Sequence, residues 1–275
     1  MGSEICISDR YLSEEAAKDT LPFTLTVSKD GEDIRSWSTD SKDRQAKLEV
    51  KDGGQTINWN LHYPDGVKVD GMILWSAGAG GPMAMPGNYT VSLKKGNNVQ
   101  TREFMVKADP RVTASQEDMA AQFQFMKGVQ DKTSEAHQAI IDLRNVRDQI
   151  KTFQDRLPED ASQELKDYGK DIIKSLTEVE EALYQTQNQS RQDPLNYPIR
   201  LTNKLAHLNS LTGIGTYKPT ASAYAVKKEI EGKIDDELAK YQSVLTNRVP
   251  QYNNMILEEG VKVISVSFKK EDARK

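Results

Sequence analysis

The spacing of apolar residues changes abruptly at Asp109-Pro110, and this change constrains the fold more than any other feature of the sequence. Before it, short stretches alternate apolar and polar residues, which is the period of a half-buried strand. After it, apolar residues recur every three or four positions, which is the period of an amphipathic helix. We therefore predict an α+β chain of two domains, with strands first and helices second.

The strand pattern fills residues 21–109. Strands are expected at residues 23–27, 34–37, 56–61, 88–93 and 101–106, where apolar side chains alternate with polar ones. Asp30-Gly31 and Lys95-Gly96 are turn signals that join neighbouring strands. Short strands between clusters of Gly, Pro, Asp and Asn, with no helical period among them, predict a small immunoglobulin-like β-sandwich.

Residues 110–258 are predicted to form an antiparallel bundle of about four long helices. The first helix is expected to start near Ser115 and to run for roughly 40 residues, because its apolar positions keep to one stripe over that length. Leu157-Pro158 ends this helix. Pro158 is expected in the first turn of the second helix, where its missing N–H costs nothing.

The last two helices have their own boundary signals. Gly213 and Gly215 are expected to end the third helix, since glycine readily takes the left-handed conformation found just past many helix ends. Thr220 is predicted to cap the fourth helix through its hydroxyl. That helix is expected to bend near Pro250, which has no backbone N–H to donate.

Residues 1–20 and 259–275 fit neither pattern. Residues 1–20 are expected to be a leader that begins with an expression scar, Met1-Gly2-Ser3. Val261 and Val263 alternate with other residues in the tail. Residues 259–275 therefore either add a strand to the sheet or stay loose, and the pattern leaves both open.

Charge and composition argue against two classes of partner. The formal net charge is −4, whereas a nucleic-acid binder normally has a basic face, so no nucleic-acid partner is expected. No apolar run approaches the ~20 residues that cross a bilayer, so no membrane partner is expected. Cys6 is the only cysteine, and it therefore forms no intrachain disulfide.

No metal, cofactor or nucleotide site is predicted. A bundle metal site built from Glu-x-x-His pairs needs a Glu three residues before the histidine, and neither His137 nor His207 has one. These two residues and His62 are interpreted as surface or polar-seam histidines. The glycines within residues 78–81 lack the Gly-Lys-Ser/Thr ending of a phosphate loop, so this stretch is interpreted as a flexible loop.

No catalytic residue is predicted, and this stretch of chain is not expected to be an enzyme. Carboxylates are plentiful, but we expect them on the polar faces of helices, where solvation and pairing with lysines explain them. The five that we considered are Glu178, Glu180, Glu181, Asp235 and Asp236. A glycosidase needs two acids across a cleft, one of them in an apolar setting, and the sequence indicates no such pair.

Aromatic residues are the best candidates for contact with a ligand or partner. Trp59 is expected in the core of the sandwich. Tyr63 and Trp75 lie in loop-like sequence, where an aromatic face can stack on a sugar ring or a peptide side chain. Tyr63 and Trp75 are therefore the candidate contact residues, and burial in the core is the alternative for each.

Several segments resemble one family. They are residues 59–65 (WNLHYPD), 71–75 (GMILW), 81–82 (GP), 86–91 (PGNYTV) and 107–111 (KADPR). Together they resemble the C-terminal region of large bacterial proteins with sortilin-like, BNR-repeat β-propellers, often described as glycosyl hydrolases. Residues 201–211 and 220–241 are similar to the closing helices of that region, so the resemblance covers most of the chain from about residue 21.

The resemblance implies that these two domains follow a propeller in a longer, exported protein. The upstream propeller is then a partner within the same chain, and the location is periplasmic or extracellular, although the sequence carries no export signal. Any hydrolase activity implied by the family belongs to the propeller. No catalytic residue is carried over to this chain.

The leading hypothesis is a non-catalytic accessory region that packs on the propeller and helps it meet another protein or a substrate. Two alternatives stay open. The first is a carbohydrate-binding module that uses Trp75 and its aromatic neighbours. The second is hydrolase activity within these 275 residues.

Overall fold

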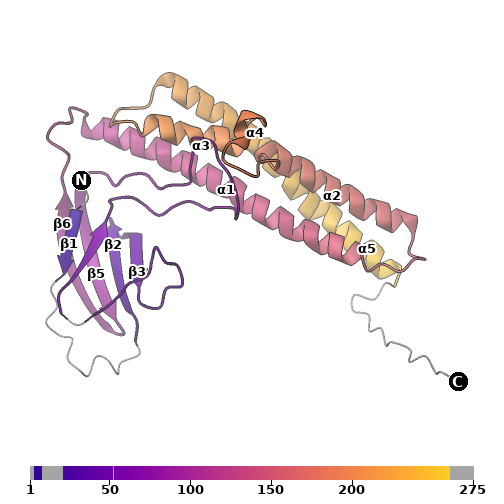
Figure 1. Ribbon diagram of the computed structural model, residues 1–275, viewed down its shortest axis with the longest axis horizontal. Coiled ribbons are helices and arrows are strands. Elements are labelled where there is room, and N and C mark those ends of the chain that lie inside the picture. Colours follow the sequence, from indigo (N-terminus) through magenta and orange to yellow (C-terminus); the bar gives the residue numbers. More distant parts are fainter. Residues whose placement is uncertain (1–2, 8–20, 52, 261–275) are drawn as a thin grey trace. The chain divides into compact units, whose positions relative to one another are not determined.

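The computed structural model describes residues 3–7, 21–51 and 53–260 (Figure 1). Within these ranges the chain is a mixed α+β protein with strands in its first part and long helices in its second part. The change of period at Asp109-Pro110 predicted this order, and the structure confirms it. The rest of the proposed leader (residues 8–20) and the tail from residue 261 lie outside the described residues, and so does the question of an added strand.

Four strands form one antiparallel sheet in the order β3-β2-β5-β6. They are β2 (Phe23–Lys29), β3 (Glu32–Ser38), β5 (Gly87–Lys95) and β6 (Asn98–Val106). The β2–β3 turn places Asp30 at φ 52° and Gly31 at φ 83°, which is the positive-φ pair that tight hairpins require. Gly96, at φ 56°, makes the corresponding turn between β5 and β6. Both predicted hairpins are therefore present.

A second, two-stranded sheet pairs β1 (Ser3–Ile7) antiparallel with β4 (Gln55–Trp59). Residues Ser3–Ile7 were expected in the leader, where no strand was predicted. Five residues are too few for a reliable strand signal, and here the strand is defined by pairing along the whole of β4, about fifty residues away in sequence. Local patterning alone does not identify such a partner.

The core beside the strands is built from alternating positions of β2, β4 and β5. Leu25, Val27, Trp59 and Tyr89 are fully buried. The rings of Trp59 and Tyr89 meet edge to face with their centroids 5.6 Å apart, which is a favourable aromatic geometry. Trp59 is therefore a core residue, as predicted, and Trp37 is buried in the same cluster.

The helices agree with the predicted stripes. They are α1 (Gln116–Gln154), α2 (Gln163–Leu183), α3 (Leu201–Thr212), α4 (Ala221–Ser243) and α5 (Val249–Glu258). The 39 residues of α1 match the expected length. The Thr220 hydroxyl accepts a hydrogen bond from the Ala223 N–H at 3.1 Å, so Thr220 caps α4 as predicted.

Two details of the helix ends differ from or refine the prediction. Pro158 is not in the first turn of α2, because that helix starts at Gln163 and its cap is Ser162, whose hydroxyl accepts from the Leu165 N–H. A side-chain acceptor satisfies an amide at the helix end, which a proline cannot do. Near Pro250, where a bend was expected, a π-helical turn, Val244–Arg248, lies directly before α5. The wider turn suits a residue that has no N–H to donate.

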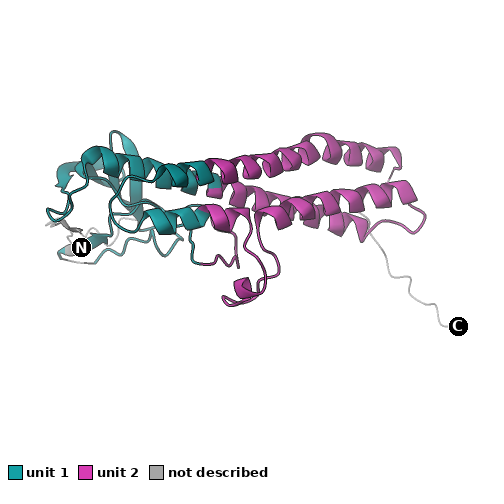
Figure 2. Ribbon diagram, turned by 90° about the horizontal axis from the view of Figure 1, so that it is seen from above, with its two compact units in different colours: residues 1–66, 76–132, 206–226 teal, residues 67–75, 133–205, 227–275 magenta. Residues whose placement is uncertain are grey.

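The chain divides into two compact units, which are coloured separately in Figure 2. Unit 1 comprises residues 1–66, 76–132 and 206–226, and unit 2 comprises residues 67–75, 133–205 and 227–275. The division passes through α1, α3 and α4 and does not follow the change of period. The domain boundaries drawn from the sequence, residues 21–109 and 110–258, stay predictions.

The core of unit 2 is the apolar stripe of α2 packed against α1. Leu165, Ile172, Leu176 and Leu183 are fully buried, as the helical spacing predicts. Burial of each such side chain contributes about 1.5–3 kcal/mol, which exceeds the ~1 kcal/mol that an interior glycine costs a helix. No helix in the described part of the chain is long and apolar enough to cross a membrane.

Gly169 in α2 and Gly232 in α4 lead to opposite predictions. A Cβ on Gly169 would meet the Gln154 side-chain amide and would lie 2.7 Å from the Tyr252 hydroxyl, whereas a Cβ on Gly232 would meet nothing within 4 Å. We expect Gly169→Ala to destabilise the fold by about 1–3 kcal/mol through overpacking. Gly232→Ala should stabilise it by about 0.5–1 kcal/mol through helix propensity. Urea unfolding followed by circular dichroism measures both, and equal effects of the two changes would contradict this packing.

Candidate functional site

Trp75 is the more exposed of the two predicted contact residues, and its backbone is fixed by one side chain of α3. The Trp75 N–H donates to Asn203 Oδ1 at 2.7 Å, and the Trp75 carbonyl accepts from Asn203 Nδ2 at 2.9 Å. Asn203 is only 4% exposed, whereas Trp75 is 36% exposed. A buried amide thus bonds the main chain of Trp75 on both sides and leaves part of the indole open to solvent.

The residue after Trp75 has an unusual backbone conformation. Ser76 adopts φ 48°, in the left-handed region that non-glycine residues seldom occupy. Its carbonyl accepts from His207 Nδ1 at 2.9 Å. Backbone strain of this kind persists only where surrounding contacts determine it, and it concentrates at functional sites. The turn that ends the exposed tryptophan segment is therefore specified by hydrogen bonds.

The segment that leads to Trp75, Val67–Trp75, belongs to unit 2 and is bonded to helices there. Two side chains of α1 contact Val67: its N–H donates to Ser134 Oγ at 3.1 Å, and its carbonyl accepts from His137 Nδ1 at 2.7 Å. The Ile73 N–H donates to the Tyr184 hydroxyl at 3.1 Å. Each of these bonds, like those of Asn203, involves the main chain of the segment, so the helices hold its course and leave its side chains to other contacts.

His137 is held in one tautomer by this arrangement. The Val67 carbonyl can only accept, so Nδ1 carries the proton and Nε2 is a free acceptor. Nε2 is buried and has no hydrogen-bond partner among the described residues, and the same holds for Thr133 Oγ1 one turn earlier on α1. Burial lowers the pKa of His137, and the hydrogen bond to Val67 opposes part of that lowering. His137 is therefore neutral near pH 7.

Tyr63, the other predicted contact residue, belongs to unit 1 and is half-buried. Its ring packs against Phe123 of α1 with the centroids 5.0 Å apart, and its N–H donates to the Pro82 carbonyl at 3.0 Å. Burial, followed by the charges of Glu32 and Asp30, raises the pKa of its hydroxyl. These contacts favour a packing role, which was the alternative considered for Tyr63.

The glycine-rich stretch within residues 78–81 is used for close packing in unit 1. A Cβ on Gly81 would lie 2.5 Å from the Pro64 carbonyl oxygen and would also meet the Tyr63 carbonyl, so only glycine fits there. His62 Nδ1 bonds the Gly81 carbonyl at 2.8 Å, and Gln130 of α1 donates to the carbonyls of Pro64 and Ala79. Hydrogen bonds thus engage the carbonyls of Ala79 and Gly81, and the interpretation of this stretch as a flexible loop stays a prediction.

One carboxylate is placed differently from the sequence expectation. Glu180 of α2 is 2% exposed and lies between two arginines of α1. Its oxygens accept from Arg144 Nε and from Arg147 Nη1, each at 2.6 Å. The expectation of a solvated polar face is wrong for this residue, because two cations on the neighbouring helix compensate its burial. The sequence did offer a signal for this ion pair: two arginines lie three residues apart on α1, and an acid lies beside the apolar stripe of α2.

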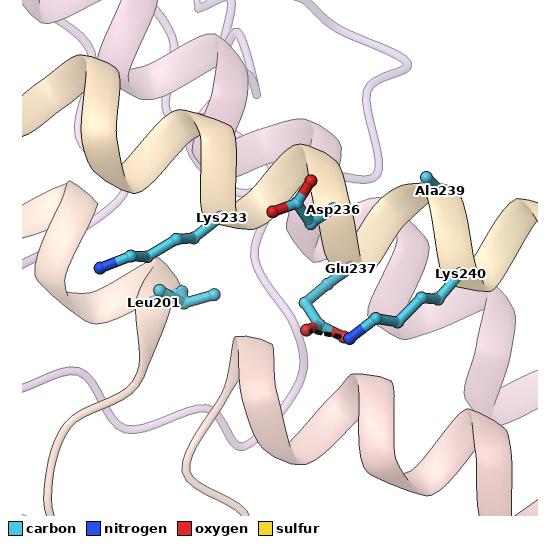
Figure 3. Close-up of a pocket in the computed structure, with 6 residues that line it drawn as sticks. All are labelled: Leu201, Lys233, Asp236, Glu237, Ala239 and Lys240. Atoms are coloured by element: carbon cyan, nitrogen blue, oxygen red, sulfur yellow. Dashed lines mark hydrogen bonds and ion pairs between the residues drawn. The ribbon is translucent and has the colours of Figure 1, made fainter.

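A surface depression of about 490 Å³ lies along α4 in unit 2 (Figure 3). Its lining comprises Leu201 of α3 and residues of α4: Lys233, Asp236, Glu237, Ala239 and Lys240. Glu237 and Lys240 pair at 2.7 Å, so one acid and one base there already satisfy each other. The depression offers mixed charge on a helix face.

In the described ranges, no group of three or more His, Cys, Asp or Glu side chains is placed to hold a metal ion. The histidines there bond backbone carbonyls instead: His62 that of Gly81, His137 that of Val67 and His207 that of Ser76. Each histidine thus has a local structural role.

Comparison with protein-family models, with curated proteins and with solved structures found no match for this chain.

Glu180 leads to a stability prediction with a matched control. Removing one partner of a buried ion pair leaves uncompensated charge and typically costs about 3–5 kcal/mol. Arg144 and Arg147 keep side-chain exposures of 33% and 21%, so water compensates them in part. We expect Glu180→Ala to cost about 2 kcal/mol. Glu178→Ala, at an exposed position of the same helix, should change stability by less than about 0.5 kcal/mol in the same urea titration. Equal losses would show that the Glu180 pairs do not form.

Proposed function

We propose that this chain is a non-catalytic interaction region that presents Trp75 to a partner protein. The observation that carries the proposal is the bidentate contact of Asn203 with the Trp75 main chain, which fixes a partly exposed indole. Tryptophan is enriched among the residues that dominate protein interfaces. A residue fixed before binding also loses less conformational entropy on association, which increases affinity.

We further propose that the strand region is an immunoglobulin-like sandwich and that the helical region is an antiparallel bundle. The burial of Trp59 from β4 with Leu25 and Tyr89 supports packing between the two sheets. The bonds from Arg144 and Gln154 of α1 to Glu180 and Lys166 of α2 support an antiparallel pair of helices. Both architectures are common scaffolds for interaction surfaces.

The wider setting of the proposal comes from the sequence resemblance. In that setting, the chain is an accessory region on the C-terminal side of an exported protein that contains a propeller. The upstream propeller is then one partner, and the partner of Trp75 is a second protein that the propeller acts on or assembles with. This setting predicts a periplasmic or extracellular location.

A carbohydrate ligand at Trp75 is the second candidate. The observation that favours it is the same exposed indole, because a flat aromatic face stacks on the apolar face of a sugar ring. A glycan array distinguishes the two candidates. Binding to an array that Trp75→Ala abolishes would support the carbohydrate candidate, whereas no array binding together with protein capture would support the leading proposal.

Site-specific crosslinking tests the leading proposal. Benzoylphenylalanine incorporated at position 75 of the full-length parent should yield a discrete protein adduct in cells. The same probe at position 257, which is an exposed apolar site in α5, serves as the control. An adduct at position 75 alone supports the proposal, and no adduct, or the same adducts from both positions, contradicts it.

Substitutions at Trp75 and Asn203 should weaken capture by different mechanisms. Trp75→Ala is expected to reduce the affinity for the crosslinked partner at least about thirtyfold, as loss of a central interface residue does. Asn203→Ala keeps the indole but frees its backbone, so a smaller loss of about three- to tenfold is expected. Surface plasmon resonance with the purified partner measures both. An unchanged affinity of Trp75→Ala for the partner would contradict the proposal.

A further inference from the structure

We propose that the Val67–Trp75 segment is released from the helices by acid, with His137 as the group that triggers the release. The geometry behind this inference is the single contact that His137 makes through Nδ1 to the Val67 carbonyl, at 2.7 Å, while its other nitrogen is buried. The release does not depend on the proposed function. Its consequence for partner binding at Trp75 does rest on that function.

A proton on His137 is costly because the nitrogen that receives it is Nε2. This nitrogen has no acceptor among the described residues, so the new N–H and its charge would be buried without a partner. Thr133 Oγ1, one turn away on α1, is also buried and has no hydrogen-bond partner among the described residues. The imidazole escapes this cost if the segment bonded to it through Val67 moves away and water reaches the ring.

Ionisable side chains on the surrounding elements do not offset that cost at close range. They include Glu135 on α1, Lys68 and Asp70 on the segment, Glu181 on α2 and Lys204 on α3, and none of these charges is among the causes of the pKa shift of His137. The buried acid Glu180 is engaged by Arg144 and Arg147. Arg144 is seven residues along α1 from His137, or about 10 Å at the helical rise. The segment, which is bonded to His137 through Val67, is thus the neighbour whose release would relieve a protonated imidazole.

The segment is suited to local release because side chains, and not the ladder of a helix or sheet, bond its main chain. Within unit 2, Ser134 and His137 bond its start, Tyr184 bonds Ile73 and Asn203 bonds its end. A turn between Val69 and Met72, closed by a 3.1 Å bond and by Gly71 at φ 71°, separates the first pair from the others. Loss of the His137 contact therefore affects the part before the turn first.

The direction of the pH dependence follows from the lowered pKa of His137 in the fold. In the released segment His137 regains an ordinary pKa near 6.5, so the released state binds the proton more readily than the closed state. The closed segment is fully favoured above about pH 6.5 and loses stability as the pH falls below that value. Each pH unit within this window changes the open-to-closed ratio by up to about tenfold.

Hydrogen exchange followed by NMR on the full chain tests the inference. After correction for intrinsic rates, the protection of the Val67 amide should fall about tenfold or more between pH 7.5 and pH 5.0. Amides in the core of α2, such as Leu176, should keep their protection, because the release is local. Val67 protection that is unchanged over this range, or a loss shared equally by Leu176, would overturn the proposal.

His137→Gln supplies the matched variant, because its amide can still donate to the Val67 carbonyl but does not titrate. Its Val67 protection should change less than about twofold over the same range. Ser134→Ala should lower that protection at all pH values and keep the pH dependence of the wild type. If His137→Gln does not fold, a pH titration of the imidazole resonances of wild-type His137 tests the proposal instead. They should titrate with the same midpoint as the Val67 amide, and different midpoints would contradict the proposed trigger.

Discussion

The structure of unit 2 depends on how nine residues of irregular chain satisfy their backbone hydrogen bonds. The Val67–Trp75 segment is neither helix nor strand, so it has no ladder to supply partners. A buried N–H or C=O without a partner costs about 1–3 kcal/mol. Four side chains supply partners: Ser134 and His137 of α1, Tyr184 directly after α2, and Asn203 of α3. This constraint explains why polar residues lie on the inward faces of helices that are otherwise apolar.

The same constraint connects packing to the proposed function. Bonds that engage only the main chain of the segment leave its side chains available, and Trp75 stays partly exposed as a result. The bonds come from side chains and not from the ladder of a helix or sheet, so we infer that the segment can open without unfolding the stripe of α2. A neutral, buried His137 among the four makes that opening sensitive to acid.

The sequence predicted the elements whose residues carry a local period. The 39 residues of α1 and the hairpin turns at Asp30-Gly31 and Lys95-Gly96 follow from patterns within each segment. The cap at Thr220 follows from one hydroxyl at a helix start. Pro158 was misplaced because two cap signals, a proline and Ser162, compete within five residues, and the side-chain acceptor of Ser162 prevails.

The rest of the candidate site could not be predicted because its contacts span long sequence separations. Val67 meets Ser134 and His137, and Trp75 meets Asn203 across 128 positions. Nothing local distinguishes Asn203 from a solvated helix residue. Glu180 was assigned to a polar face for the same reason, since its arginines belong to another helix. Trp75 was predicted as a contact residue from the sequence, because an aromatic residue in loop-like sequence is a candidate whatever its distant contacts are.

The most direct test of the account is amide exchange at the residues that the helices are said to hold, measured at pH 7.5. The account predicts that Val67, Ile73 and Trp75 are protected at least about a hundredfold, as hydrogen-bonded amides in a closed state are. Each should lose that protection in one variant only: Val67 in Ser134→Ala, Ile73 in Tyr184→Phe and Trp75 in Asn203→Ala. Free exchange of all three amides in the wild-type protein would contradict it.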